Sequence, residues 1–218
     1  MIPRRPQAAP RVDDTARFEA AVQLVDKVAH DLNNALLVIK GYSSVLRTSL
    51  TSPEQLADVD EIARAADHAA SLTRRLLELG HPPAADASSA GGLEHGTETI
   101  LLVEDDQSVR DLVRNMLERG GYRVLAASRP SEAEVLLAEE QRVDLLLSDV
   151  VMPEMSGFEL AARLRLGRPE MRTLFMSGNA YVASSSTHAD DELLKKPFEP
   201  AELAHAVRGV LDRPAVPA

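Results

Sequence analysis

Apolar residues repeat with a helical period in the first third of the chain. No proline occurs between residues 13 and 50. Apolar side chains recur there at alternating spacings of three and four, at Val25, Val28, Leu32, Ala35, Ile39, Tyr42 and Leu46. This heptad pattern predicts one long helix with a single packed seam.

A second helix is predicted directly after the first. Ser52, Pro53 and Gln55 are typical of a helix start, and Gly80 followed by two prolines predicts its end. Its apolar residues keep the same alternating spacing, at Val59, Ile62, Ala66, Ala69 and Leu76. We therefore expect residues 13–80 to form an antiparallel helical hairpin.

The predicted hairpin has a second apolar flank that it cannot bury alone. This flank consists of Leu56, Ala63, Ala70 and Leu77. Exposed apolar surfaces of this kind are usually covered by another copy of the chain. We therefore expect a homodimer in which two hairpins form a four-helix bundle.

The second half of the chain alternates short apolar runs with helical patterns. The runs are Thr99–Val103, Tyr122–Ala127, Val143–Ser148, Thr173–Ser177 and Glu192–Lys195. Helical patterns begin near Ser108, Ser131, Gly157 and Pro200, and a weak one covers residues 181–189. Five such units predict an α/β domain over residues 98–213, with a doubly wound five-stranded parallel sheet.

The remaining segments are predicted to lack packed structure. Residues 81–97 are rich in Pro, Ala, Ser and Gly without a period and are expected to be a linker. Residues 1–12 and 214–218 are expected to be flexible tails. The chain of 218 residues is thus expected to hold two modules.

Composition excludes several classes of function. The net charge of −10 opposes binding to nucleic acid, and the absence of Cys excludes disulfides and thiolate metal sites. No apolar run approaches the roughly 20 residues that a membrane span needs, and no signal peptide is evident. We therefore expect a cytoplasmic protein.

Polar residues follow four of the predicted strands. Glu104 and Asp105 follow the first, Asp149 the third, Ser177 ends the fourth and Lys196 follows the fifth. The carboxyl ends of parallel strands meet at one edge of a sheet, and carboxylates gathered there favour Mg²⁺. Asp149 could then attack phosphorus, while Lys196 and Ser177 contact phosphoryl oxygens. A capping role, common for an acid after a strand, explains single residues but not this set.

The first predicted helix carries a second candidate acceptor, His30. It lies about 200° around the helix from Val28 and Leu32, so we expect it to be exposed. Asp31 follows it, and Asn34 lies one turn further along. A carboxylate at one ring nitrogen leaves the other free as a nucleophile, although a lone surface histidine is usually only solvated.

Residues 98–213 resemble the receiver domain of two-component response regulators. The resemblance rests on the acidic residues, Met152-Pro153, Gly157 and Lys196-Pro197. It implies the following roles: Glu104 and Asp105 as the acidic pair, Asp149 as phosphoacceptor, Val151 as a backbone carbonyl ligand of the metal, Ser177 as the switch hydroxyl, and Lys196 as the lysine that precedes the expected Pro197. Leu193 stands where many members have an aromatic residue.

Residues 20–80 resemble the dimerisation and histidine-phosphotransfer domain of histidine kinases. The resemblance rests on the run Val28–Asn34, on Gly41-Tyr42 and on residues 69–77. It implies that His30 is the phosphoacceptor, Asp31 its acidic neighbour and Asn34 a phosphatase-type residue. Ala35 replaces a proline of the family.

No ATP-binding motif accompanies these two acceptors. Neither a phosphate loop nor an Asp-x-Gly-x-Gly motif occurs, and residues 81–97 are too few for a nucleotide-binding domain. We therefore expect a phosphorelay protein that needs Mg²⁺ and no other cofactor, with a separate histidine kinase or response regulator as partner. Whether the chain is itself an enzyme stays open. The alternatives are a non-enzymatic adaptor whose hairpin only dimerises or docks to a kinase, and a hairpin that forms mixed dimers with one.

Overall fold

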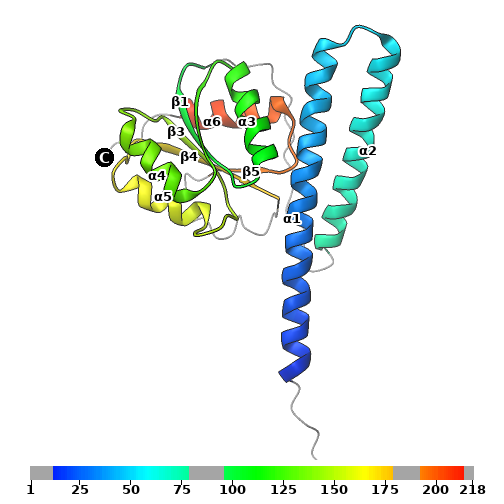
Figure 1. Cartoon of the computed structure of the whole chain (residues 1–218), viewed down its shortest axis with the longest axis horizontal. Helices are drawn as coiled ribbons and strands as arrows, with labels where there is room; N and C mark the ends of the chain where they lie inside the picture. Colours follow the sequence, from blue (N-terminus) through cyan, green and yellow to red (C-terminus); the bar gives the residue numbers. More distant parts are fainter. Residues whose placement is uncertain (1–11, 79–95, 179–191, 214–218) are drawn as a thin grey trace, which may run out of the picture.

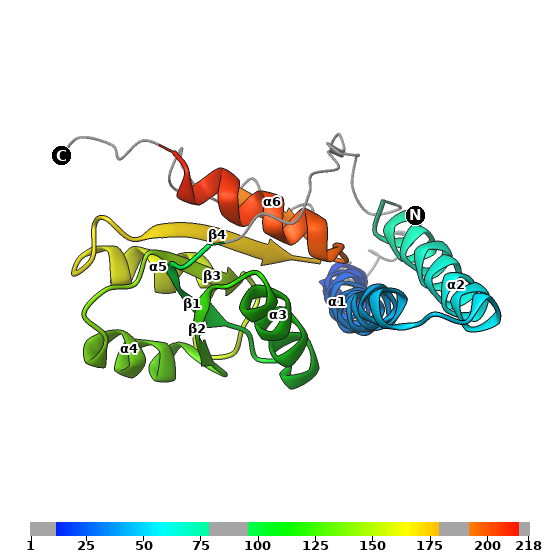
Figure 2. The same ribbon diagram turned by 90° about the horizontal axis from the view of Figure 1, so that it is seen from above.

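The computed structural model describes residues 12–78, 96–178 and 192–213. Helix α1 (Val12–Ser49) and helix α2 (Pro53–Glu78) form an antiparallel pair. The remaining elements form an α/β domain on the opposite side of α1 from α2, so that α1 is the central element of the molecule (Figures 1 and 2).

The hairpin packs through a different face of α1 than the heptad pattern predicted. Leu36 is buried against Ala66 and Ala70 of α2, with Ala69 beside them. All seven residues of the seam predicted on α1 are instead solvent-exposed, namely Val25, Val28, Leu32, Ala35, Ile39, Tyr42 and Leu46. The predicted seam was wrong because α1 has two apolar faces and the period does not say which of them meets α2.

The prediction was also wrong for part of α2. Ile62 of the predicted seam is exposed, whereas Ala70, assigned to the second flank, is buried. Small alanine side chains let the two helices approach closely around Leu36, because a leucine fits between residues that project little from the partner helix. The exposed apolar surface of the hairpin therefore lies mainly on α1.

Five parallel strands form the sheet of the α/β domain in the order β2-β1-β3-β4-β5. The strands are β1 (Thr99–Val103), β2 (Arg123–Ala127), β3 (Leu145–Asp149), β4 (Arg172–Ser177) and β5 (Glu192–Lys195). The helices are α3 (Gln107–Arg119), α4 (Pro130–Glu139), α5 (Gly157–Arg165) and α6 (Pro200–Leu211). The predicted doubly wound sheet is confirmed; the weak helix expected over 181–189 lies outside the described residues.

Alternating strand residues build one apolar layer on each side of the sheet. Ile100 and Leu102 of β1 face α3 and α6, whereas Leu101 and Val103 face α4 and α5. Both layers are fully buried, as expected for a parallel sheet covered on both faces. Among the described residues, no helix combines the length and apolar character needed to cross a membrane.

The carboxyl ends of the strands point towards α1 (Figure 2). Leu37 of α1 is completely buried and belongs to the same apolar cluster as Leu112 and Leu117 of α3. The hairpin is thus packed onto the edge of the sheet at which parallel α/β domains place their ligands.

Candidate functional site

Asp149 lies at the end of β3, in the middle of the sheet. Its side chain is only 1% exposed, and its Oδ1 accepts a hydrogen bond from the backbone N–H of Val150 at 2.8 Å. Gly157 begins α5 beside it, and a Cβ there would lie 2.2 Å from the Asp149 carbonyl oxygen. A glycine is therefore required for α5 to start so close to the end of β3.

Lys196, directly after β5, joins the carboxylates of two strands. Its Nζ lies 2.7 Å from Glu104 Oε2 and 3.3 Å from Asp149 Oδ2, and its side chain is fully buried. The ammonium group compensates the charge of both buried carboxylates. Its removal would be unfavourable, because a buried carboxylate without a cationic partner is costly. The residues predicted from separate strand ends thus converge.

The acidic residues form a group with room for a cation. One carboxylate oxygen each of Glu104, Asp105 and Asp149 lies within 4.8 Å of the others. Glu104 Oε1 is buried without a hydrogen-bond partner among the described residues, and Asp105 is exposed. Asp106 is engaged elsewhere, since it caps α3 by accepting from the backbone N–H groups of Ser108 and Val109. An unpartnered buried oxygen beside two further carboxylates fits a hard divalent ion such as Mg²⁺.

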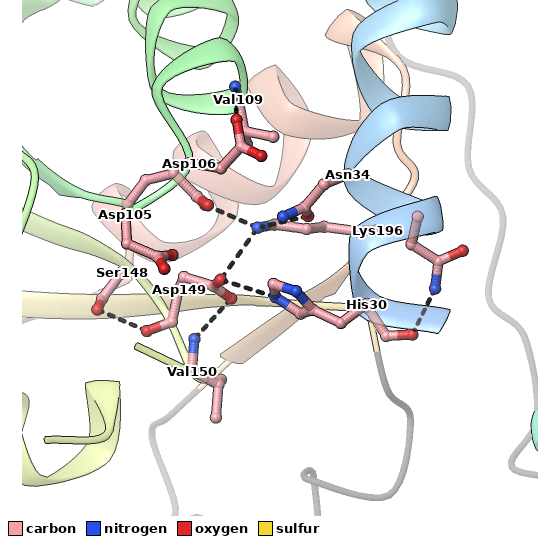
Figure 3. A network of polar contacts seen from close by, with 12 residues as sticks. His30, Asn34, Asp105, Asp106, Val109, Ser148, Asp149, Val150 and Lys196 are labelled. Atoms are coloured by element: carbon pink, nitrogen blue, oxygen red, sulfur yellow. Dashed lines mark hydrogen bonds and ion pairs between the residues drawn. The ribbon is translucent and has the colours of Figure 1, made fainter. Parts of the chain in front are cut away.

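His30 lies against Asp149 rather than in solvent. Its Nε2 is 3.3 Å from Asp149 Oδ2, and its Nδ1 is 3.6 Å from the exposed carboxylate of Asp31. The side chain is 20% exposed, so the expectation of an exposed histidine was wrong. His30 does point away from the predicted seam of α1, as expected, but the α/β domain covers that side of the helix. Figure 3 shows His30 and Lys196 directed at one carboxylate.

The two asparagines after His30 also reach the α/β domain. Asn34 is buried, and its Oδ1 lies 3.4 Å from Lys196 Nζ. Asn33 donates from Nδ2 to the carbonyl oxygen of Gly178 at 2.9 Å, just beyond β4. Asn34 therefore lies at the predicted site, and Asn33 ties α1 to the loop after β4.

The charges of the site shift one another's pKa values. The hydrogen bond to Asp149 raises the pKa of His30, although burial opposes it. Burial alone would raise the pKa of Asp149, but Lys196 and His30 outweigh it, and the pKa falls. Burial raises the pKa of Glu104 to about 7 against the opposing effect of Lys196. Burial would lower the pKa of Lys196, but Glu104 and Asp149 raise it. Lys196 and the contact with His30 thus favour the carboxylate form of Asp149.

Two further predicted residues lie beside this network. Ser177 is buried at the end of β4, and its carbonyl oxygen accepts from the backbone N–H of Lys196 at 2.7 Å. Val151 is exposed in the loop after β3 and lines a pocket of about 490 Å³ together with Met152 and Phe158. Ser177 is therefore packed beside the lysine, whereas Val151 lies at the open margin of the site.

Three residues of α1 that position the site were not predicted from chemistry. Leu37 packs into the apolar core of the α/β domain, and Lys40 Nζ lies 2.7 Å from Asp67 and 3.2 Å from Glu199. At Gly41 a Cβ would lie 2.5 Å from Leu112 Cδ2. The one available signal was Gly41, because glycine in the middle of a helix is unfavourable unless another element approaches closely.

Comparison with known proteins agrees with this geometry. Residues 100–208 match the response regulator receiver domain. The chain is 38% identical over 115 residues to the response regulator receiver protein CpdR of Brucella abortus, covering 51% of this chain and 95% of that protein. The chain belongs to the response regulator receiver family. Residues 20–84 match the His Kinase A (phospho-acceptor) domain, so a receiver and a hairpin of this second family occur together.

Further relatives share the receiver. Over 122 residues the chain is 37% identical to the sensor kinase CckA of Brucella abortus, covering 54% of this chain but only 13% of that kinase. A crystal structure of a response regulator receiver protein from Sinorhizobium medicae matches with a TM-score of 0.50 and 27% identity, covering 53% of this chain and 95% of the other. The receiver and the phosphoacceptor hairpin are components of two-component phosphorelay signalling.

Proposed function

We propose that the chain is a phosphorelay protein that exchanges a phosphoryl group between His30 and Asp149. The observation that carries this proposal is the 3.3 Å contact between His30 Nε2 and Asp149 Oδ2, which joins the two candidate acceptors of one chain. Proximity of this kind removes much of the entropic cost of bringing two reacting groups together. Lys196, within 3.3 Å of the same oxygen, supplies positive charge where phosphoryl oxygens would gather.

In the proposed exchange, the bond from phosphorus to His30 Nε2 breaks as a bond to a carboxylate oxygen of Asp149 forms. The imidazole keeps the electron pair of the broken bond and takes up a proton. The reverse step restores phosphohistidine. In hydrolysis, water attacks the phosphorus bound to Asp149, the carboxylate leaves with the electron pair, and Asn34 orients the water.

The two acceptors must separate before the exchange can occur. During transfer the phosphorus atom lies in line between the attacking and the leaving atom. The nitrogen and the oxygen must therefore be farther apart than in a hydrogen bond. The observed contact is therefore the resting arrangement of the unphosphorylated chain. Lys196 and Ser177 remain on the receiver and keep the site in order as α1 moves.

Glu104, Asp105, Asp149 and the Val151 carbonyl are proposed to hold Mg²⁺, which when bound supplies positive charge for the phosphoryl oxygens. The fit rests on the three clustered carboxylates and the unpartnered Glu104 oxygen. The remaining work falls to this chain's own side chains. Asp149 presents the nucleophilic oxygen, and Asp31 holds Nδ1 of His30 so that Nε2 faces Asp149.

The proposed partners are a separate histidine kinase or response regulator and a second copy of the chain. The exposed apolar row on α1 that includes Val28, Leu32 and Ile39 supports a homodimer, since such a row is rarely left in water. This row lies on the side of α1 away from His30. Two hairpins could therefore pair through it while each hairpin stays docked on the receiver of its own chain. The lack of Cys fits a reducing compartment, and a cytoplasmic location belongs to the proposal.

The same exposed row favours the adaptor as a second candidate function. In that case Asp149 is phosphorylated by a separate kinase, and the hairpin serves only to dimerise or to bind that kinase. The contact between His30 and Asp149 would then be structural. The two candidates differ in whether His30 ever carries a phosphoryl group.

A labelling experiment separates the two. Purified chain is incubated with a histidine kinase of broad specificity and ATP carrying a γ-³²P label, as wild type, His30→Gln and Asp149→Asn. We expect acid-labile, base-stable label in the wild type that is lost in His30→Gln. Base-labile label that depends only on Asp149 would refute the exchange and leave the adaptor.

A further inference from the structure

The hairpin denies access to the carboxylate that the proposed function phosphorylates. Asp149 is 1% exposed, and both of its oxygens are engaged. Oδ1 accepts from the backbone N–H of Val150, while Oδ2 lies 3.3 Å from both His30 Nε2 and Lys196 Nζ. One of these partners, His30, belongs to α1. A phosphorus atom has no open line to either oxygen while α1 stays in place.

We propose that the docked hairpin is an inhibitory cover: it withholds Asp149 from phosphoryl donors in solution, and the carboxylate reacts with them only after α1 moves off the receiver. This inference rests on the proposed role of Asp149 as phosphoacceptor. It adds a regulated step, since the chain would have a closed form and an open form.

Close packing holds the cover over α3. Leu37 is completely buried within the apolar cluster that includes Leu112. One turn further along α1, a Cβ on Gly41 would lie 2.5 and 2.8 Å from the two methyl carbons of Leu112 and 2.8 Å from Met116 Cε. The backbone of α1 therefore rests directly on side chains of α3, and a bulky residue at position 41 fits only if Leu112 and Met116 move aside or the two helices separate.

Polar contacts hold the cover on the other side of the site. Asn33 donates to the Gly178 carbonyl oxygen at 2.9 Å, and both groups are buried. Lys40, with 12% of its side chain exposed, lies 3.2 Å from Glu199 at the start of α6 and 2.7 Å from Asp67 of α2. Lys40 thus ties the receiver to both helices of the hairpin. These contacts orient α1 so that His30 faces Asp149.

The cover can open without unfolding the receiver. Among the described residues, Leu37 is the one hairpin side chain buried in this cluster and Val38 packs against it from α1, whereas the other buried members come from the receiver. Farther along, α1 and α3 part to form a groove of about 350 Å³ lined by Tyr42, Val45, Asn115, Met116 and Arg119. The contact is thus one helix face with an open end rather than a shared core. Helix faces of this kind separate as rigid bodies.

The cover and a separate phosphohistidine donor exclude each other. Such a donor must bring its phosphorus to an oxygen of Asp149, at the opening where His30 now lies. As the new bond from phosphorus to oxygen forms, the bond to the donor nitrogen breaks, and the donor keeps the electron pair and takes up a proton. The donor can bind in this way only after α1 has left.

The test compares two glycine substitutions in the full chain. Gly41→Leu places bulk against Leu112 and Met116, whereas Gly209→Leu in α6 meets nothing within 4 Å of its Cβ and is the matched control. Both substitutions replace glycine with a good helix former, so neither weakens its own helix. Lys40→Glu, which repels Glu199 without adding bulk, is a second opening variant. Circular dichroism verifies that each variant is folded.

The first readout is the rate at which phosphoramidate with Mg²⁺ phosphorylates Asp149. We expect Gly41→Leu and Lys40→Glu to react at least about tenfold faster than wild type. This factor is the increase in the open population that the free-energy cost of overpacking a tight interior would cause. Gly209→Leu should react as wild type does. Equal and measurable rates in all four proteins would overturn the cover.

The second readout does not depend on phosphorylation. Arg119 Nη2 lies 3.4 Å from Thr48 Oγ1, so this pair straddles α1 and α3. The chain has no cysteine, and Thr48→Cys with Arg119→Cys therefore allows spin labels at these two sites alone. We expect one narrow distance distribution in the wild-type background and a broad one with Gly41→Leu. A broad distance distribution in the wild-type background refutes the cover. A narrow distribution there, combined with no phosphorylation of any variant, refutes the proposed function and leaves the cover standing.

Discussion

Replacing Leu37 with alanine should weaken the docking of the hairpin far more than the fold of either part. Leu37 is fully buried in the receiver's apolar cluster, and its neighbour Leu36 is buried against α2. The same substitution at these adjacent positions thus removes equal volume from two different contacts. Leu36→Ala is the matched control, because it acts inside the hairpin.

The size of the effect follows from the buried side chain. A buried leucine truncated to alanine costs about 2–5 kcal/mol in lost transfer energy and cavity formation. Since Leu37 fills a contact between hairpin and receiver, this cost falls on the docking equilibrium. At about 1.4 kcal/mol per factor of ten, the open form should become roughly 30-fold to several thousand-fold more populated.

Thiol labelling measures this change directly. Met116 lies beneath α1, with its Cε 2.8 Å from the Cβ position of Gly41. Met116→Cys gives the chain a single cysteine, which a thiol reagent reaches freely once α1 leaves. The labelling rate should rise with the open population in Leu37→Ala, up to the rate of an unprotected thiol, and should change little in Leu36→Ala. Equal rates in the two variants would refute the assignment of Leu37 to the docking contact.

Three further predictions concern the site and the assembly. Lys196→Met removes the ammonium partner of Glu104 and leaves Asp149 with His30 alone, so it should destabilise the receiver by about 3–5 kcal/mol in urea unfolding, while Lys27→Met, at an exposed position, should not. Mg²⁺ at tenfold its Kd should stabilise the wild type by about 1.4 kcal/mol, and loss of this gain in Asp105→Asn is the check by thermal melting. Leu32→Glu should convert a dimer to a monomer in light scattering, whereas Val135→Glu on α4 should not; a wild-type monomer would contradict the proposed dimer.

The receiver could be predicted from the sequence because its pattern is local. Each strand is a short apolar run, and the polar residue that follows it marks the edge where Glu104, Asp149 and Lys196 meet. Parallel topology then brings these residues together without further information. The five-stranded parallel sheet and the convergence of the three side chains agree with that expectation.

The position of the hairpin could not be predicted in the same way. His30 and Asp149 are 119 residues apart, and no local pattern records that they meet. The exposed and buried faces of α1 were exchanged in the prediction because both carry apolar residues at helical spacing. Leu37 was one apolar residue among many, and only the packed structure shows it inside the receiver.

Helix α1 carries three distinct surfaces around a single cylinder, of which the third is the proposed dimer contact. Leu36 faces α2, Leu37 faces the receiver, and Leu32 lies on the exposed apolar row. A helix has only about 3.6 residues per turn, so nearly every position from residue 28 to 46 serves one of the three surfaces. Few sites there can change freely. A library of random substitutions should therefore lose function across α1 much more evenly than across α2, where tolerance should return every third or fourth residue.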